Sequence, residues 1–317
     1  MADTSPPPPR GGPWLPITSE ATLRACSAFQ AKDVDVFVCS YPKSGTTLCQ
    51  NIVAQILTKG VNNKSDDDST NTFPFQHVSQ VSPFFEIDAH WDHGSEKAST
   101  SGSAQLSESV IENHSNLLRG RRAFNTHLPY EMMPFVWDTQ SEKTTSRRPK
   151  IIYICRDGRD AAVSFWHHLK SQCVEDGGLE NKDFHNFFDE WLNGEIVFGS
   201  WFDHLVGWEQ AREDPNALMI TYEEAVSDLK TVVAKIAEHI DFENPLTGAE
   251  LTQITKKCSF DAMKKDLNRY QPISVTWTDP DFSFIRKGKI GGYKDTFTEE
   301  QLERFETETR KKFGEKV

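Results

Sequence analysis

Short apolar segments alternate along this chain with longer segments whose apolar residues recur at helical spacing. Four short segments predict strands: residues 34–40 (VDVFVCS), 121–126, 150–155 (KIIYIC) and 217–221 (ALMIT). The segments 150–155 and 217–221 are apolar almost throughout, which is typical of strands that are buried on both faces.

Helices are predicted after these strands. In residues 46–60 the helical spacing continues to Gly60, which predicts the end of that helix. Further helices are predicted from about residue 159 to 172, after residue 221, and after Thr298, where Gln301 completes a capping box. Repeated β–α units predict an α/β fold in which helices cover both faces of a mostly parallel central sheet. Ligands of such sheets bind at the carboxyl ends of the strands.

The chain is predicted to form a single domain over residues 14–317. Residues 1–13 are rich in proline and glycine, so we expect a disordered tail there. Three polar segments near residues 61–72, 94–109 and 139–148 are predicted to be loops inserted into this domain.

Composition and charge narrow the range of partners. Among 317 residues, 35 Lys and Arg oppose 47 Asp and Glu, so the formal net charge is −12. This balance argues against general binding to nucleic acid or to an anionic membrane. It is compatible with a local basic cluster that binds a small anionic ligand. Because no stretch of about 18 apolar residues occurs, we expect no membrane-spanning segment.

The six cysteines indicate a reducing compartment. None of them has a spacing typical of zinc ligands, and Cys39 and Cys155 lie in apolar segments, as buried thiols do. The first twelve residues, MADTSPPPPRGG, contain no apolar segment of the kind that signal peptides have. We therefore expect a cytoplasmic protein.

The segment 40–47 (SYPKSGTT), between a predicted strand and a predicted helix, carries the strongest chemical signal. Gly45 permits close approach of the backbone to a ligand, and the first amides of the helix point toward an anion. Lys43 adds a positive charge, and Thr46 and Thr47 add hydroxyl donors. These features predict a phosphate-binding, P-loop-like turn, although it lacks the GxxxxGK[ST] pattern of the Walker A motif.

YPKSGTT resembles the 5′-phosphosulfate-binding loop of the cytosolic sulfotransferases, which use 3′-phosphoadenosine 5′-phosphosulfate (PAPS) and release adenosine 3′,5′-bisphosphate (PAP). Further segments resemble this family in the same order from about residue 13 to residue 314. Arg156 at a strand end and Ser164 on the next helix resemble its 3′-phosphate signature, and FIRKGKIGG (284–292) resembles its C-terminal RKGxxG segment. The resemblance implies that the donor is bound by Lys43, Ser44, Gly45, Thr46, Thr47, Arg156, Ser164, Arg286, Lys287 and Gly288, with Tyr222 and Phe260 flanking the adenine.

The resemblance also implies a mechanism. His127 in NTHLP matches the catalytic histidine, which takes a proton from the hydroxyl or amine of the acceptor as a general base. Lys43 is then expected to neutralise charge on the leaving side, and Ser164 to hold the 3′-phosphate and restrain Lys43. Phe84 in SPFFE matches a position beside the acceptor pocket, where aromatic residues predict a small, partly apolar acceptor. No metal ion is implied.

Three positions depart from the family pattern, and they keep an alternative open. Asn125 stands where the family usually has Lys, Leu48 where it has an adenine-stacking Trp, and Glu299 where its dimer segment has Val. The alternative is a sulfotransferase-like protein that binds PAPS or PAP with little or no turnover. A P-loop kinase is disfavoured because the Walker A motif and an acidic Mg²⁺ ligand are missing. Glu299 predicts a monomer or a non-standard dimer.

Overall fold

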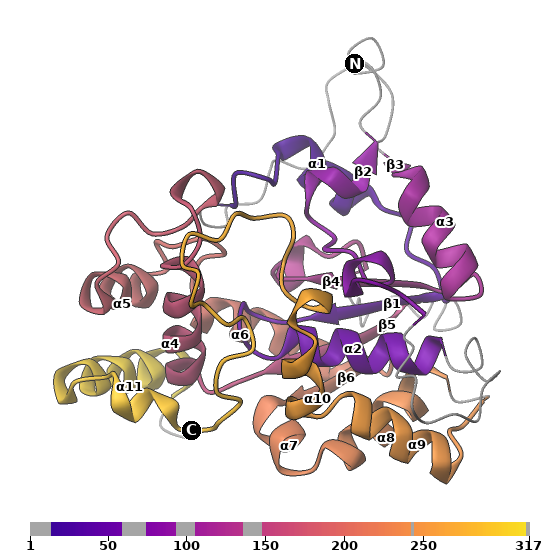
Figure 1. Ribbon diagram of the computed structural model, residues 1–317. Helices are drawn as coiled ribbons and strands as arrows, with labels where there is room; N and C mark the ends of the chain where they lie inside the picture. The colour runs from indigo at the N-terminus through magenta and orange to yellow at the C-terminus, as the bar shows by residue number, and fades with distance from the viewer. Residues whose placement is uncertain (1–13, 59–73, 93–104, 136–147, 242–243, 315–317) are drawn as a thin grey trace.

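The computed structural model describes residues 14–58, 74–92, 105–135, 148–241 and 244–314. Its central sheet has four parallel strands in the order β4 (Arg122–Thr126), β1 (Asp35–Cys39), β5 (Lys150–Cys155) and β6 (Ala217–Thr221). Each of the four predicted strands is confirmed. Figure 1 shows the sheet at the centre of the molecule, with helices in front of it and behind it.

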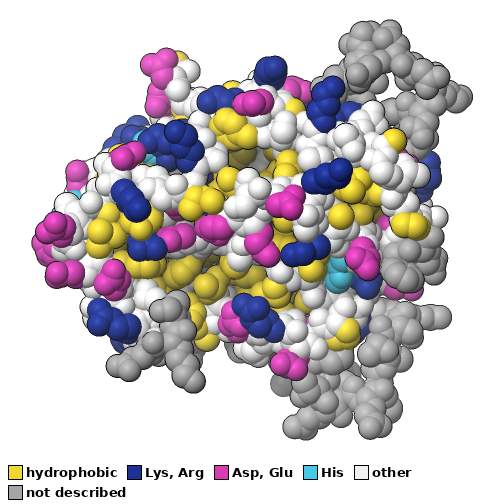
Figure 2. Space-filling view, turned by 90° about the horizontal axis from the view of Figure 1, so that it is seen from below, with side chains coloured by type: hydrophobic (Ala, Val, Ile, Leu, Met, Phe, Trp, Pro, Cys, Tyr) yellow, Lys and Arg dark blue, Asp and Glu magenta, His cyan; other side chains and the backbone are white. Residues whose placement is uncertain are grey.

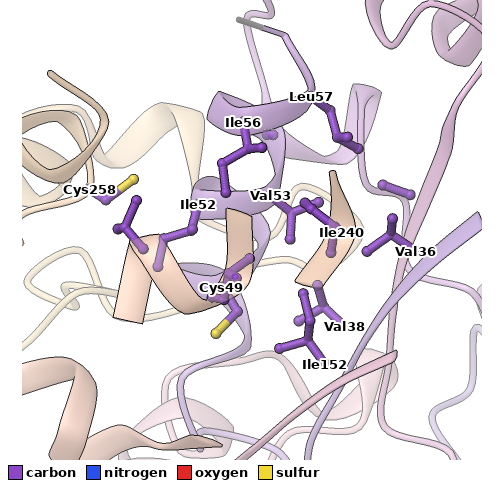
Figure 3. Close-up of a cluster of buried hydrophobic side chains, with 14 of the residues drawn as sticks. Val36, Val38, Cys49, Ile52, Val53, Ile56, Leu57, Ile152, Ile240 and Cys258 are labelled. Carbon is purple, nitrogen blue, oxygen red and sulfur yellow. The ribbon is translucent and has the colours of Figure 1, made fainter. Parts of the chain in front are cut away.

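The strands bury side chains on both faces. Val36 and Val38 of β1 point to one face, where α2 (Thr46–Leu57), α8 (Leu229–Ile240) and α9 (Gly248–Lys257) pack (Figure 3). Phe37 and Cys39, which alternate with them, point to the opposite face, toward α1 (Glu20–Ala28) and α3 (Glu108–Leu117). The α/β fold with helices on both faces of a parallel sheet is therefore confirmed.

A third cluster of buried side chains, mostly aromatic, lies beside the sheet. It joins α4 (Gly158–Leu169), α5 (Phe184–Asn193), α6 (Trp201–Glu209) and α11 (Glu299–Phe313). Trp191 of α5, for example, stacks on Phe305 of α11 with ring centroids 6.1 Å apart. The aromatic residues of α6, Trp201, Phe202 and Trp208, are likewise buried in the core.

Several element boundaries differ from the sequence-based expectations. Helix α4 ends at Leu169 rather than near residue 172, because Gln172 instead bridges to Trp277 in an extended pair. Residues 105–109, predicted as part of a loop, form β3 (Gln105–Leu106) and the start of α3, and β3 pairs with β2 (Trp91–Asp92). Burial of Leu106 stabilises that pair. The tail 1–13, the loop 61–72, residues 94–104 and residues 139–147 lie outside the described residues.

The remaining elements are short. Helix α7 (Tyr222–Ser227) directly follows β6, and α10 (Phe260–Lys265) follows α9. The predicted capping box of α11 is present, with Thr298 Oγ1 accepting from the Gln301 amide at 3.2 Å. Figure 2 shows Lys and Arg side chains interspersed with Asp and Glu on the face seen from below, without an extended basic area there.

A buried ion pair joins the starts of β1 and β4. The Arg122 guanidinium donates to both carboxylate oxygens of Asp35, at 2.6 and 2.5 Å, and Asp35 is fully buried. Removing one partner of such a pair leaves a buried charge without compensation, so Asp35→Ala should lower the free energy of unfolding by about 3–5 kcal/mol. Glu20→Ala, which breaks the exposed Glu20–Arg24 pair, should cost less than about 1 kcal/mol. Urea unfolding of both variants measures the difference, and equal costs would contradict this account.

Candidate active site

The loop between β1 and α2 has a backbone that only a few residue types adopt without strain. Lys43 and Gly45 both have positive φ, +65° and +112°. A Cβ at position 45 would lie 2.7 Å from Ile154 Cδ1 and 3.0 Å from Tyr222 Cδ2, so glycine is required there. Gly45 is the N-cap of α2 and provides no side-chain cap, and the first turn of α2 contains no acidic residue. Its amides are therefore available to an anion.

One cavity of about 740 Å³ lies at the carboxyl ends of the strands. Residues at the carboxyl ends of all four strands reach it: His127, Arg156 and Tyr222 directly follow β4, β5 and β6, and Lys43 lies in the loop between β1 and α2. The structure brings almost all of the sequence-predicted residues to its wall, namely Lys43, Gly45, Thr46, Thr47, Phe84, His127, Arg156, Ser164, Tyr222, Phe260, Arg286, Lys287 and Gly288. Ser44 does not line it, and its buried Oγ has no hydrogen-bond partner among the described residues.

Three cations gather at one end of this cavity. Burial, with the nearby charges of Arg156 and Arg286, lowers the pKa of Lys43 to about 7. Arg156 lies over the Tyr222 ring, 4.3 Å from its centroid, and donates to the backbone carbonyls of Lys43 and Lys289. The Arg156 Nε is buried and has no partner in the part of the chain that the structure describes. Positive charge and an unused donor together indicate an anion site.

Asp160 fixes the segment that carries Arg286. Its carboxylate accepts from the amides of Gly291 at 2.7 Å and Tyr293 at 2.9 Å, and it lies 3.7 Å from the Arg156 guanidinium. In the same segment, a Cβ on Gly288 would lie 2.3 Å from the Phe260 ring, so the chain passes close over α10. These contacts hold the C-terminal segment over the cation cluster.

His127 is held from three sides. Its Nδ1–H donates to the Ser40 carbonyl at 2.7 Å, its backbone amide donates to Glu86 Oε1 at 2.7 Å, and its carbonyl accepts from His204 Nε2 at 3.2 Å. The rings of Phe84 and Phe198 pack edge-on against the imidazole, with centroids 4.9 and 5.2 Å away. Nδ1 carries the proton, so the lone pair is on Nε2.

The environment keeps the His127 imidazole neutral. Burial lowers the pKa of His127 to about 4, opposed by the hydrogen bond to Ser40 and assisted by the Lys43 charge. Burial likewise raises the pKa of Glu86 to about 7. At neutral pH His127 is therefore able to accept a proton at Nε2.

Sequence reasoning missed the polar residues that hold this site: Glu86, Asp160, His168 and His204. Each makes its main contact with a group distant in sequence, as Asp160 does with Gly291 and His168 with Lys43 Nζ. Asp160 and His168 lie one helical turn before and one turn after Ser164 on α4, but this spacing does not identify their partners. Ser164 makes no hydrogen bond to Lys43 within the described residues, which differs from the restraining role expected for it.

The sulfotransferase domain family model matches residues 33–317 of this chain. The chain belongs to the sulfotransferase domain family. It is 30% identical over 309 residues to sulfotransferase 2A1 of Homo sapiens, covering 96% of this chain and 92% of that protein. It is 30% identical over 291 residues to luciferin sulfotransferase of Photinus pyralis, covering 89% of this chain and 72% of that protein. Its fold is similar to mouse sulfotransferase SULT7A1 complexed with PAP, with a TM-score of 0.66, 28% identity and coverage of 95% and 91% of the two chains.

Two of the three departures of this sulfotransferase from the family pattern lie at the cavity wall. Asn125 is buried, and its Nδ2 donates to the Ser82 carbonyl at 2.9 Å, so its amide fixes the segment that leads to Phe84. Leu48, in the first turn of α2, packs against the core cluster that contains Val36 and Val38 and also lines the cavity. Both side chains therefore have structural contacts in this sulfotransferase.

No helix among the described residues of this sulfotransferase has both the length and the apolar composition that crossing a bilayer requires. No cluster of three or more His, Cys, Asp or Glu side chains among them has the arrangement of a metal site. All six cysteines are free thiols, and Cys26, Cys39, Cys49 and Cys258 are buried.

Proposed function

We propose that this sulfotransferase transfers a sulfuryl group from PAPS to a hydroxyl or amine of a small, partly apolar acceptor, with His127 as the general base. One observation carries the proposal. A single cavity joins a cluster of three cations to a neutral imidazole whose Nε2 lone pair has no partner among the described residues.

The residues at the cationic end fit the donor. PAPS carries a 3′-phosphate and a 5′-phosphosulfate, and when bound it supplies the activated sulfuryl group. We assign the phosphosulfate to Lys43 with the first amides of α2, and the 3′-phosphate to Arg156, Ser164 and Arg286. The unpartnered Arg156 Nε and the lowered pKa of Lys43 support this assignment. A bound anion would accept a hydrogen bond from Nε and would raise the pKa of Lys43 by stabilising its charged form. The structure of the mouse relative with PAP supports the nucleotide class.

His127 performs the proton transfer in this proposal. The neutral imidazole receives the acceptor proton at Nε2, and the Ser40 carbonyl, which accepts from Nδ1–H, stabilises the imidazolium that forms. The rings of Phe84 and Phe198 restrict the imidazole orientation. Lys43 would stabilise the negative charge that develops on the leaving side.

Apolar side chains contribute to the cavity wall, among them Phe84, Ile87, Phe165, Phe198 and Ile273. Two of them, Phe84 and Phe198, pack against His127. A wall of this kind suits an acceptor that combines one nucleophilic group with an apolar body. The name of the Photinus pyralis relative, luciferin sulfotransferase, is consistent with such acceptors.

An acceptor screen tests the proposal. The protein is incubated with ³⁵S-labelled PAPS and a panel of phenols, hydroxysteroids and amines, and in parallel with γ-³²P-ATP. We expect ³⁵S-labelled product with at least one acceptor and no transfer from ATP. Binding of PAPS without product across the panel would favour the non-catalytic alternative, for which neutral Asn125 is the motivating observation. Transfer from ATP would contradict the donor assignment.

The affinity for PAP should depend on pH through Lys43. Its pKa of about 7 in the free protein means that the amine loses its charge above pH 7, whereas a bound phosphate raises that pKa. The dissociation constant should therefore rise up to about tenfold per pH unit above pH 7, with proton uptake on binding. Calorimetry in buffers of different ionisation enthalpy measures both. Lys43→Arg, which stays charged, should abolish the dependence, and an equal dependence in this variant would exclude Lys43 as its source.

Location and assembly form part of the same proposal. The six free thiols support a reducing compartment such as the cytosol. Glu299 is exposed in the first turn of α11, and a two-fold contact through it would bring two carboxylates together. We therefore propose a monomer or a dimer that uses another surface.

A further inference from the structure

His168 lies at the wall of the cavity, and neither the motifs nor the proposed reaction assigns it a role. It is in the last turn of α4, one turn after Ser164. Its ring is surrounded by aromatic rings, with centroid distances of 5.1 Å to Trp277, 5.9 Å to Phe284, 6.3 Å to Phe282 and 6.4 Å to Phe165. This packing fixes the orientation of the ring, so the contacts of its two nitrogens determine what the side chain can do.

One of these nitrogens faces the catalytic lysine. His168 Nδ1 is 3.4 Å from Lys43 Nζ, and Nζ also lies 4.0 Å from the centroid of Phe284. Burial and the charge of Lys43 hold the pKa of His168 well below its usual value, so the imidazole is neutral. Because an ammonium only donates, Nδ1 is the acceptor and the proton is on Nε2.

Lys43 needs such a partner. Burial and the charges of Arg156 and Arg286 act against its protonated form, and its side chain is flexible. The other groups that face it are neutral: the His127 imidazole and the Phe284 ring, whose face attracts a cation. Among the described residues, His168 is the one side chain that forms a hydrogen bond with Nζ.

We propose that His168 is the positioning residue of Lys43: its Nδ1 accepts a hydrogen bond from the Lys43 ammonium and holds this cation in the cavity against the two arginines. The role of Lys43 in transfer rests on the proposed function, whereas the contact itself does not. Ser164, on the same helix face, then remains free to bind the 3′-phosphate.

The test measures the protonation of Lys43 in the free protein. Lysines are labelled with ¹³C at Cε, the Lys43 signal is assigned by its loss in Lys43→Arg, and its shift is followed from pH 5 to 10. His168→Phe keeps a packed ring but removes the acceptor, so the Lys43 pKa should fall by about one unit, the equivalent of one charge-assisted hydrogen bond. His168→Asn, whose amide lies near the position of Nδ1, should restore the wild-type value, whereas His168→Gln should not.

Matched controls make the result decisive. His185→Phe introduces the same substitution at an exposed helix position, where the side chain is 62% exposed, and should leave the Lys43 titration unchanged. If His168→Phe does not fold, the Lys43 pKa values of His168→Asn and His168→Gln are compared instead. Equal Lys43 pKa values in the wild type and in either His168→Phe or His168→Gln would overturn the proposal.

A second readout separates this proposal from the proposed function. The Asn variant should retain PAP affinity at pH 7. The Phe variant, whose Lys43 pKa falls from about 7 to about 6, should lose about fivefold at pH 7 and only about twofold at pH 6, where more of its Lys43 is protonated. Wild-type protein that binds no PAP would contradict the proposed function and leave the NMR result intact. A pH-independent loss in the Phe variant would contradict the positioning role.

Discussion

Replacement of His127 by alanine should lower the single-turnover rate of sulfuryl transfer about 10²–10⁴-fold, the usual contribution of a general base. The affinity for PAP should stay close to that of the wild type, because the His127 imidazole donates to the Ser40 carbonyl, packs against Phe84 and Phe198, and is neutral. Rapid quench with ³⁵S-labelled PAPS measures the rate, and calorimetry measures the affinity.

The pH profile provides an independent check on this base. Because the pKa of His127 is about 4 in the free protein, the neutral form persists far below pH 6.5. The wild-type kcat/KM for PAPS reports on the free enzyme. It should therefore show no loss from protonation of His127 at pH 6, where an ordinary histidine is mostly protonated. His185→Ala serves as a control at an exposed site. A His127→Ala rate within a few-fold of the wild type would assign the base to another residue.

Combined loss of Arg156 and Arg286 should abolish stabilisation by PAP. A ligand at about 100 times its dissociation constant stabilises the folded protein by roughly 2.7 kcal/mol. Hydrogen bonds to charged groups contribute about 1.5–3 kcal/mol each, so removing two of these cations should reduce the affinity by at least about 10²-fold. Thermal unfolding of Arg156→Ala/Arg286→Ala with and without PAP measures the effect.

The unliganded double variant should unfold at nearly the wild-type temperature. Arg156 and Arg286 both lower the pKa of Lys43, so their removal relieves repulsion that offsets the lost contacts of Arg156 with the Lys43 and Lys289 carbonyls and the Asp160 carboxylate. Asp160 keeps its hydrogen bonds from the Gly291 and Tyr293 amides. Arg24→Ala/Arg310→Ala removes the same charge from exposed positions and should keep the full PAP shift. A full shift in the Arg156/Arg286 variant would contradict the 3′-phosphate assignment.

The sequence was sufficient to predict the sheet because its strands are buried on both faces. Such strands have nearly continuous apolar segments, as in KIIYIC, and helical spacing resumes after the strands that end near residues 40, 155 and 221. The pair β2–β3 was missed because two-residue strands contain no alternation of apolar and polar positions. The predicted helix 159–172 was too long at its C-terminal end, because Gln172 pairs with Trp277 instead. These two residues are far apart in sequence, so local sequence does not indicate their contact.

The candidate site was predictable where its residues lie at or just beyond the carboxyl ends of strands. Lys43, His127 and Arg156 each lie in a short contiguous motif, so local sequence identifies them. Asp160 and His168 act on groups more than 120 residues away in sequence, and only the folded chain brings these partners together. Their charges or ring nitrogens are not distinguishable in sequence from those of an ordinary helix surface.

A crystal structure of the protein with PAP tests the central claim most directly. The account predicts density for PAP in the cavity at the carboxyl ends of the strands, with one phosphate on Lys43 and the first amides of α2. The other phosphate should contact Arg156, including the Nε that has no partner among the described residues, and Arg286. His127 Nε2 should remain open toward the apolar end. PAP bound at another surface, or in this cavity without contact to Arg156 and Lys43, would contradict the account.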